Sequence, residues 1–483
     1  MKNIKPIFWI LILAAILRLI NLNQSLWLDE AIQWWASTSF SVRQLLTQYS
    51  IGDFNPPLFY VITHYWIKLF GDSEISLRFP SVIFGVATVY LVYKISQLIL
   101  PKRNYKLYAT SYTLPDLAAL LAATSGLLIY YSQEARVYSL AALTTTGAIY
   151  YLLKLKKSNH PPSAISYLLF AISMLYSHYL TWLLIPVFLF AQPLLTSIAL
   201  ISLVPWLPIF LKQLSQGANV ISVNPVWGNV LGGLTFKNTA LIPIKFLFGR
   251  IPVEANLFYA VVIGIPLALV TYLLFKSLPK KPFAIRHLLA QASSPFAAIW
   301  LWLLIPLLLG AIISTKIPIF SYFRFLFVVP AFYILLTIGA SKLKSSHRSK
   351  ALAFLVLLNL LASSYYLLAS SNHRENWKAA AAYIHKTNPQ APVFIRSAVK
   401  SPFEYYDRGT SSQFSEKNIQ EAVVYPEIWY IPYAQPIFDP EQNTINTLKE
   451  FGFVEKETKH FRGVTVQRLQ NPTYRHLSQS LTN

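Results

Sequence analysis

Carboxylates are scarce in the first 370 residues, and their positions are the first sign of chemistry. The segment LWLDEAIQWWA carries the pair Asp29 and Glu30, and the segment YYSQEARVYSL carries Glu134 two positions before Arg136. A positioned carboxylate can act as a general base toward a hydroxyl group. An acid and a base as close as Glu134 and Arg136 make a compact polar cluster. These four residues are therefore the first candidates for an active site.

The composition is that of a membrane protein. Of 483 residues, 54% are hydrophobic and only 12% are charged, whereas a soluble domain contains about 25% charged residues. The absence of cysteine excludes a disulfide scaffold, a thiolate metal site and a cysteine nucleophile. The apolar content also excludes a disordered chain. We expect an α-helical polytopic membrane protein with one soluble part.

The net charge of +22 reflects membrane topology rather than nucleic-acid binding. Residues 1–370 contain 28 Lys and Arg against 8 Asp and Glu, whereas residues 371–483 contain 13 against 11. The bases of the first part sit mainly in short clusters between apolar runs, which is the pattern that membrane insertion produces. A nucleic-acid-binding protein gathers its positive charge on one soluble face. We therefore expect no nucleic-acid partner.

About eleven apolar stretches are long enough to be transmembrane helices. They lie near 6–22, 80–100, 114–131, 137–153, 164–177, 180–193, 195–211, 256–275, 296–313, 321–340 and 351–369. A cytoplasmic N-terminus places five basic segments, with sixteen Lys and Arg and no acid, on the inner side, as the positive-inside rule requires. Seven of the eight carboxylates of the first part then lie outside. Because acids beside a bilayer are costly, this asymmetry predicts a water-facing site at the outer membrane boundary.

The chain is expected to have two parts. Residues 1–370 form a transmembrane module, whose external loop 23–79 carries the Asp–Glu motif, and residues 371–483 form a small external α/β domain. Its strand-like runs lie at 391–397, 422–432 and near 460–468, and a helix-like stretch lies at 445–452. Within the external loop, residues 30–49 are expected to form one interfacial helix, with Trp34, Trp35 and Phe40 turned toward lipid.

Several motifs, taken in order, resemble glycosyltransferase family 39, which includes the protein O-mannosyltransferases and the aminoarabinose transferases of lipid A. The motifs are LWLDEA, NPPLFY, GDSEISLRFPS, YYSQEARVYSL, the late segment TKIPIFSYFRFLFVVP and the segment RENWKAAAAYI. The resemblance spans most of residues 1–385 and implies a glycosyltransferase of the C-type fold. It also implies an inverting transfer from a polyprenyl-phosphate sugar to a hydroxyl group, at the outer face of the plasma (inner) membrane.

The resemblance also suggests roles for individual residues. Family members place a catalytic Asp at the position of Asp29, which is therefore the expected general base, and Glu30 and Glu134 are the further catalytic candidates. The planar guanidinium of Arg136 is suited to the donor phosphate. The expected residues for binding the donor phosphate or substrate are Arg136, Asn55, His178, Tyr322 and Arg324.

Structural alternatives stand beside these roles. Asp29 and Glu30 would also suit the N-terminus of a helix, and Arg136 and Arg324 would also suit snorkelling anchors. For His178 and Asn55 a structural role is the simpler prediction. Glu74 and Arg78 stand four residues apart on an expected helix, so an ion pair within that helix is the simplest prediction.

The main functional alternative is a transporter or flippase of lipid-linked sugars. Such proteins carry ionisable residues near the middle of their spans and often consist of repeats, and neither feature is evident here. A scaffold that only displays the outer domain would not explain the asymmetry of the carboxylates. No metal-binding motif supports a divalent ion, and no cofactor is required. The sugar is not identified, and a glycan, a lipid and a protein remain open as the acceptor.

Overall fold

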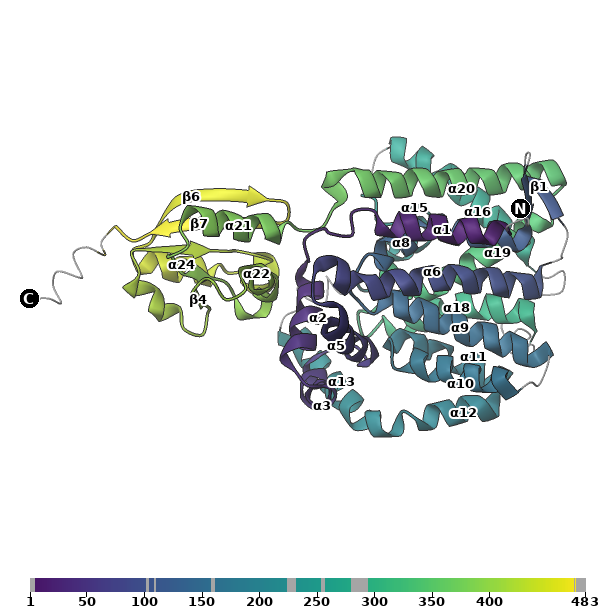
Figure 1. Cartoon of the computed structure of the whole chain (residues 1–483), viewed down its shortest axis with the longest axis horizontal. Coiled ribbons are helices and arrows are strands. Elements are labelled where there is room, and N and C mark those ends of the chain that lie inside the picture. Colours follow the sequence, from purple (N-terminus) through teal and green to yellow (C-terminus); the bar gives the residue numbers. More distant parts are fainter. Residues whose placement is uncertain are drawn as a thin grey trace, which may run out of the picture.

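The computed structural model describes residues 5–100, 104–107, 110–157, 161–223, 232–252, 257–278, 294–472 and 474. Within this part of the chain, the first three quarters form a bundle of apolar helices, and the last quarter forms a small sheet with helices (Figure 1). The start of α1 (Pro6–Leu19) and the strand β1 (Asn104–Leu107) lie at the end of the bundle opposite to that sheet (Figure 1).

Each of the eleven predicted apolar stretches overlaps one helix or a short run of consecutive helices; the stretch 195–211 also includes η3 (Val204–Trp206). These helices are α1, α6 (Glu74–Ile99), α7 (Leu114–Thr124), α8 (Gly126–Ser132), α9 (Tyr138–Lys157), α10 (Pro161–Leu175), η2 (Tyr179–Leu184), α11 (Ile185–Ala191), α12 (Pro193–Ile201), α13 (Leu207–Val223), α16 (Leu257–Ser277), α18 (Pro295–Ile313), η4 (Tyr322–Val328), α19 (Val329–Ser341) and α20 (Ser345–Leu368). Among the described residues, six helices are long and apolar enough to cross a membrane, and α7 with α8 makes a seventh if this bent pair is one span. The number of spans therefore stays a prediction.

The bend between α7 and α8 places the loop that carries Glu134. Ser125 interrupts the helix with an extended backbone, and its side chain accepts a hydrogen bond from the amide of Leu128, which caps α8. The two helices consequently differ in direction by 58°. The chain from Gly126 to Val137 is buried throughout, so the polar residues that follow α8 lie inside the protein rather than on its rim.

The first long connection is a chain of short helices rather than one interfacial helix. Its elements are α2 (Leu28–Ser39), α3 (Val42–Gln44), η1 (Leu45–Tyr49), α4 (Ser50–Gly52) and α5 (Leu58–Phe70). The single helix expected over 30–49 is therefore wrong, because the backbone is extended at Phe40 and Ser41, and the side chain of Ser41 caps α3 in a capping box with Gln44.

The tryptophan expected to reach toward lipid has protein partners instead. Trp34 donates a hydrogen bond from its indole to Asp72 at 2.8 Å, and its ring meets Tyr405 edge-on with centroids 5.0 Å apart. Trp35 and Phe40 pack with Tyr49 in a small cluster of aromatic rings. The connection is thus folded onto the protein by its aromatic side chains.

The C-terminal part is built on a five-stranded mixed sheet in the order β4-β3-β5-β7-β6. Its elements are α21 (Trp377–Thr387), β3 (Val393–Phe394), α22 (Ser401–Asp407), β4 (Gln413–Phe414), β5 (Glu427–Tyr430), α23 (Gln435–Phe438), α24 (Asn443–Glu450), β6 (Val454–Phe461) and β7 (Val464–Gln470). Strand β3 is parallel to β4 and β5, whereas β7 is antiparallel to β5 and β6. The α/β character expected for this part is present, and the expected helix at 445–452 overlaps α24.

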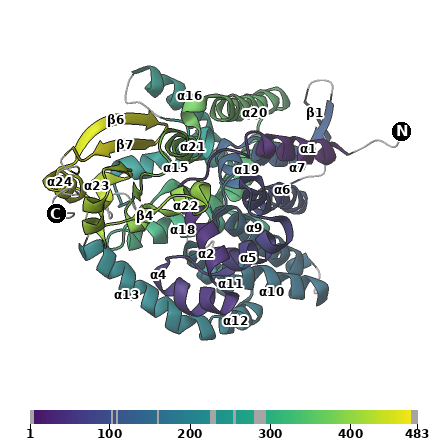
Figure 2. The same cartoon turned by 60° about the vertical axis from the view of Figure 1, so that its left-hand side comes forward.

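Two separate apolar clusters cover the faces of this sheet. One contains Trp377, Phe403 and Trp429, and the other contains Phe394, Ile428 and Leu448. Leu28, the first residue of α2, packs against the first cluster. The sheet thus lies at the end of the bundle that carries α2 and α5, and the turned view again shows α22 beside α2 (Figure 2).

Candidate active site at the mouth of the helix bundle

An ion pair joins the two expected reactive residues. Asp29 lies in the first turn of α2 and Arg136 lies in the loop between α8 and α9, and their side chains meet at 3.3 Å. The carboxylate side chain is 33% exposed, whereas that of Arg136 is 10% exposed. The pair therefore has a buried cation and a carboxylate that solvent or a substrate can reach.

The loop that carries Arg136 is tied to two neighbouring helices by Gln133. The amide nitrogen of Gln133 donates to the carbonyl oxygen of Ile20 at 2.7 Å, just beyond α1. Tyr366 of α20 donates its hydroxyl to the amide oxygen of Gln133 at 3.0 Å. These bonds fix the loop just before Glu134. The site is therefore positioned by α1 and α20, the first and last helices of the bundle.

Glu30 is fully buried and saturated by strong partners. Arg78 donates to both of its carboxylate oxygens, at 2.8 Å from Nε and 2.6 Å from Nη2, and the amide of Ala135 donates to Oε1 at 2.8 Å. Burial raises the pKa of Glu30, but the Arg374 and Arg78 cations together lower it below its usual value. Glu30 thus joins α2 to α6 and to the loop after α8 as a carboxylate.

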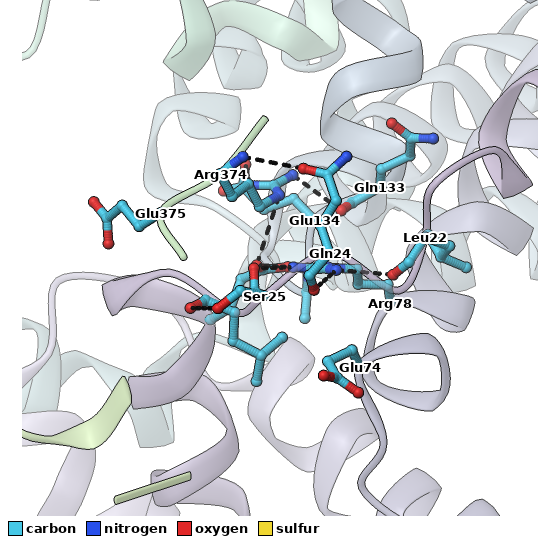
Figure 3. Close-up of polar contacts among 12 residues, drawn as sticks. Leu22, Gln24, Ser25, Glu74, Arg78, Gln133, Glu134, Arg374 and Glu375 are labelled. Atoms are coloured by element: carbon cyan, nitrogen blue, oxygen red, sulfur yellow. Dashed lines mark hydrogen bonds and ion pairs between the residues drawn. The ribbon is translucent and has the colours of Figure 1, made fainter. Parts of the chain in front are cut away.

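The expected ion pair between Glu74 and Arg78 is wrong. The remaining N–H groups of Arg78 donate hydrogen bonds to the carbonyl oxygens of Leu22, Gln24 and Ser25 (Figure 3). Glu74 pairs instead with Lys378 at 3.2 Å. A distance of four residues along a helix permits contact, but here the buried carboxylate of Glu30 outcompetes the more exposed one for the guanidinium.

Glu134 and Arg136 each keep one buried polar atom without a partner among the described residues. These atoms are Oε1 of Glu134 and Nε of Arg136. Burial raises the pKa of Glu134, although the cation of Arg374 opposes that rise. Buried polar groups in native proteins are usually hydrogen-bonded, and the exceptions often mark a ligand, an ion or an ordered water. The two atoms therefore mark a candidate position for a bound group.

Further cations surround this position, and sequence reasoning missed one of them. Arg250 is exposed, donates to the hydroxyl of Tyr130 at 2.7 Å and stacks 4.8 Å from the centroid of that ring. Arg324 is half-buried and donates to the carbonyl oxygen of Pro318 at 3.1 Å. Arg250 follows Gly249 with no motif around it, so no signal in the sequence singles it out. An accessible guanidinium in this setting is suited to phosphate oxygens.

The other expected binding residues line the same region through aromatic contacts. Tyr138 meets Tyr131 edge-on and His178 at a tilt, with ring centroids 5.0 and 5.9 Å away, and Tyr322 lies under the ammonium group of Lys245 at 5.9 Å. Burial, with help from nearby Arg324 and Arg136, lowers the pKa of His178 to about 3. His178 is therefore a neutral imidazole, and its Nδ1 accepts from the amide of Leu180 at 3.2 Å.

Asn55 contributes its backbone rather than a visible side-chain contact. Its amide donates to Asp53 at 3.3 Å, and its carbonyl oxygen accepts from Gln213 at 3.4 Å. Burial raises the pKa of Asp53, against the opposing influence of Arg136. The turn formed by Asn55 thus brings a further carboxylate toward the Arg136 side of the site.

Metal binding has no structural support in the described ranges. Among these residues, no three His, Asp or Glu side chains lie together as metal ligands would. The carboxylates of Asp29, Glu30 and Glu134 each lie beside an arginine, in the order Arg136, Arg78 and Arg374.

Comparisons with known proteins agree with this architecture. The crystal structure of ArnT from Cupriavidus metallidurans bound to undecaprenyl phosphate matches with a TM-score of 0.55 at 10% identity, over 96% of this chain and 97% of that one. The apo form of the same protein matches with a TM-score of 0.53 at 11% identity over the same shares. The chain therefore has the C-type fold of polytopic membrane glycosyltransferases.

Within that fold, one segment of the sequence matches a family model. Residues 55–215 match the family model described as dolichyl-phosphate-mannose-protein mannosyltransferase. A comparison with curated protein sequences gives no match. The expected resemblance to glycosyltransferase family 39 is confirmed over this segment, and the apolar helices together with the shared fold support a multi-pass membrane protein.

Proposed function

We propose that the protein transfers a sugar from a polyprenyl-phosphate carrier to an acceptor hydroxyl, with Asp29 as the general base. The observation that carries this proposal is the Asp29–Arg136 pair at 3.3 Å, in which the carboxylate is accessible and the cation is buried. The match to a protein bound to undecaprenyl phosphate supports a carrier of this kind. The sugar and the acceptor are left open, and a glycan, a lipid or a protein would each offer the required hydroxyl.

The reaction follows from the roles of the charged groups. Asp29 accepts the proton of the acceptor hydroxyl as its oxygen attacks the anomeric carbon of the sugar. The bond between that carbon and the phosphate oxygen breaks, and the electron pair leaves with the polyprenyl phosphate. An attack from the face opposite to the leaving group inverts the anomeric centre. The phosphate needs no proton, and Arg136, Arg250 and Arg324 are proposed to stabilise its added charge.

The remaining candidates assist this step. Oε1 of Glu134 has no partner among the described residues and is proposed to accept a hydrogen bond from the acceptor or the sugar. Glu30 is proposed to act through α2, since its oxygens are already bound by Arg78 and Ala135. Asn55, His178 and Tyr322 are proposed to shape the walls of the donor site.

The proposed setting is the outer face of the plasma (inner) membrane. The N-terminus and the basic segments would then lie in the cytoplasm, in accord with the positive-inside rule. The module 1–370 would span the bilayer, and residues 371–483 would form a domain on the outer, periplasmic side. This arrangement places Asp29 where a lipid-linked sugar, rather than a nucleotide sugar, is the available donor.

The proposal is tested with Asp29→Asn in cells that produce the full chain. Removal of a positioned general base lowers the rate by about 10²- to 10⁴-fold, so the polyprenyl-phosphate sugar should accumulate and the modified acceptor should disappear. Mass spectrometry of membrane lipids and envelope glycans measures both. The matched control is Asp72→Asn, whose carboxylate binds Trp34 and Arg408 instead of Arg136, and it should retain transfer.

The outcomes also separate a transferase from a flippase. A flippase leaves the bond between sugar and phosphate intact, so the wild-type protein would move the donor without releasing polyprenyl phosphate. Full transfer by Asp29→Asn, inserted at normal levels, would show that the base has been assigned wrongly.

A further inference from the structure

The chain enters its C-terminal part through a buried arginine that reaches into the candidate active site. Arg374 follows α20, and only 3% of its side chain is exposed. Its Nη1 donates to Glu134 at 3.1 Å, and its Nη2 donates to the carbonyl oxygen of Gln133 at 2.9 Å (Figure 3). Its Nε lies 3.7 Å from Oε2 of Glu30, and its guanidinium stacks 4.7 Å from the centroid of Tyr130. One side chain thus bridges both carboxylates that flank the Asp29–Arg136 pair.

The next residue reaches the other side of the same pair. Glu375 points away from Arg374 (Figure 3) and accepts hydrogen bonds from Tyr433 at 2.6 Å and from the indole of Trp377 at 2.9 Å. Burial raises the pKa of the Glu375 carboxyl, and the nearby backbone amide of Leu28 is one of the groups that oppose this rise. Leu28 is the first residue of α2, whose own N-cap residue, Trp27, provides no side-chain cap. Glu375 therefore places its carboxylate near the N-terminus of the helix that begins one residue before Asp29, where a negative charge is favourable.

The hairpin of β6 and β7 fixes these two residues from behind. Arg462 in its turn donates from Nε to the carbonyl oxygen of Arg374 at 2.6 Å, and the carbonyl oxygen of Arg462 accepts the amide of Asn376 at 2.8 Å. Gly463 has a φ of +72°, and a Cβ atom there would lie 2.7 Å from Cγ of Glu375. Only glycine fits this turn without displacing Glu375. The hairpin tip lies at the end of the sheet nearest the bundle (Figure 1).

We propose that Arg374 and Glu375 are positioning residues, through which the C-terminal part sets the geometry of Asp29 and Arg136. Arg374 fixes the loop that carries Glu134 and Arg136, and Glu375 fixes the first turn of α2. The sheet is then a working component of the reaction centre and not an appendage. The inference deepens the proposed transferase function and rests on it for the kinetic part of its test.

The positive charge of Arg374 also affects the pKa of Glu134, which the packing of its side chain does not. Burial raises the pKa of Glu134, and the neighbouring cation of Arg374 lowers it again. Without that cation, Glu134 would take up a proton at a higher pH, and any activity that needs its carboxylate would be lost at a higher pH. The groups that face Glu134 are Arg374, Glu30, Arg250, Arg136, Tyr130, Tyr131, Tyr138, Tyr322 and Tyr366.

The test compares Arg374→Ala, Arg374→Lys and Glu375→Gln in the full chain. The matched control is Arg408→Ala, because Arg408 also joins the C-terminal part to the first connection, through Asp72 at 2.7 Å, but is 48% exposed and does not contact the site. A misplacement of about 1 Å lowers rates about 100-fold. We expect a fall in kcat of that order for Arg374→Ala, with a smaller fall for Glu375→Gln and none for Arg408→Ala.

Two further readouts separate positioning from general stability. The acid limb of the pH–rate profile should move to higher pH in Arg374→Ala but remain in place in Arg374→Lys, which keeps the charge and loses only the planar fork. Hydrogen–deuterium exchange should rise at residues 28–31 and 133–137 in Arg374→Ala and not in Arg408→Ala. The exchange measurement needs no substrate. If Arg374→Ala folds poorly, the exchange of Arg374→Lys and Glu375→Gln still tests the positioning role.

The results that would overturn the inference are specific. Equal kcat and equal exchange in Arg374→Ala and Arg408→Ala would show that Arg374 positions nothing. An unchanged acid limb in Arg374→Ala would exclude its action on Glu134. If the wild-type protein consumed no polyprenyl-phosphate sugar, the proposed function would fail, while the exchange pattern would still decide the positioning role.

Discussion

At the scale of single residues, burial decides which ion pairs matter. The Glu30–Arg78 pair has 0% and 1% side-chain exposure, and its oxygens and nitrogens are fully engaged. The Glu74–Lys378 pair has a lysine side chain that is 62% exposed. Solvent screens the second pair, so this pair contributes little to stability. Loss of one partner from the first pair, by contrast, leaves an unpaired charge in the protein interior.

We therefore predict that Arg78→Met destabilises the protein strongly. Breaking a buried ion pair costs about 3–5 kcal/mol, because Glu30 would keep only the more distant cation of Arg374, at 3.7 Å. Thermal unfolding in detergent should show a large fall in the midpoint temperature. Lys378→Ala is the control and should change stability by no more than about 1 kcal/mol; equal effects in the two variants would refute the prediction.

At the scale of elements, glycines set the closest helix contacts. Gly339 of α19 lies against α16, where a Cβ atom would come 1.9 Å from the carbonyl oxygen of Leu273. Small residues allow the backbones of membrane helices to approach closely. The same principle operates where Gly249, with a φ of +67°, meets the backbone of Gly126 at the start of α8. These contacts hold the bundle that supports the site.

Gly339→Ala should consequently push α16 and α19 apart. The obstacle is backbone, which cannot swing aside as a side chain does, so a loss of about 1–3 kcal/mol is expected from overpacking. The control is Gly264→Ala in α16, where nothing lies within 4 Å of the added methyl group. Thermal unfolding of both variants checks the prediction, and a loss of stability only in Gly264→Ala would contradict it.

At the scale of the whole molecule, the two ends of the bundle differ. The C-terminal sheet and α2 lie at one end, whereas the N-terminal start of α1 and the strand β1 lie at the other (Figure 1). The basic segment 342–350 covers the connection between α19 and α20 and the first residues of α20. If the basic end faces the cytoplasm, the proposed orientation makes the sheet and the Asp29–Arg136 pair accessible from outside.

The absence of native cysteine makes this orientation easy to test. We predict that Lys459→Cys, at an exposed position of β6, reacts with a membrane-impermeant maleimide added to intact cells. Ser346→Cys, at an exposed position at the start of α20, should react only after the membrane is permeabilised. Labelling in the reverse pattern would invert the proposed topology and move the candidate site to the cytoplasmic face.

Much of the fold follows from local patterns. Eleven apolar stretches predict where the long helices lie. An apolar segment that crosses a bilayer must pair its own backbone N–H and C=O groups by hydrogen bonds, and a helix does this. The prediction of one interfacial helix over 30–49 is wrong, since the same Trp and Tyr residues that suit a lipid interface also suit contacts with other aromatic rings. Trp34 packs on Tyr405, more than 370 residues later in the chain, and no local pattern reports such a partner.

The sequence by itself determined the class of the fold, the motifs around Asp29 and Glu134, and the uneven distribution of acids and bases. Only the tertiary structure decided which charges meet. It pairs Arg78 with Glu30 instead of Glu74, adds Arg250 to the candidate site and brings Arg374 from the C-terminal part between the two buried glutamates. Spacing along a chain defines which side chains can meet within one helix. The pairing of buried charges is set by the packing of elements that are distant in sequence, because each buried charge must find its partner wherever the fold provides one.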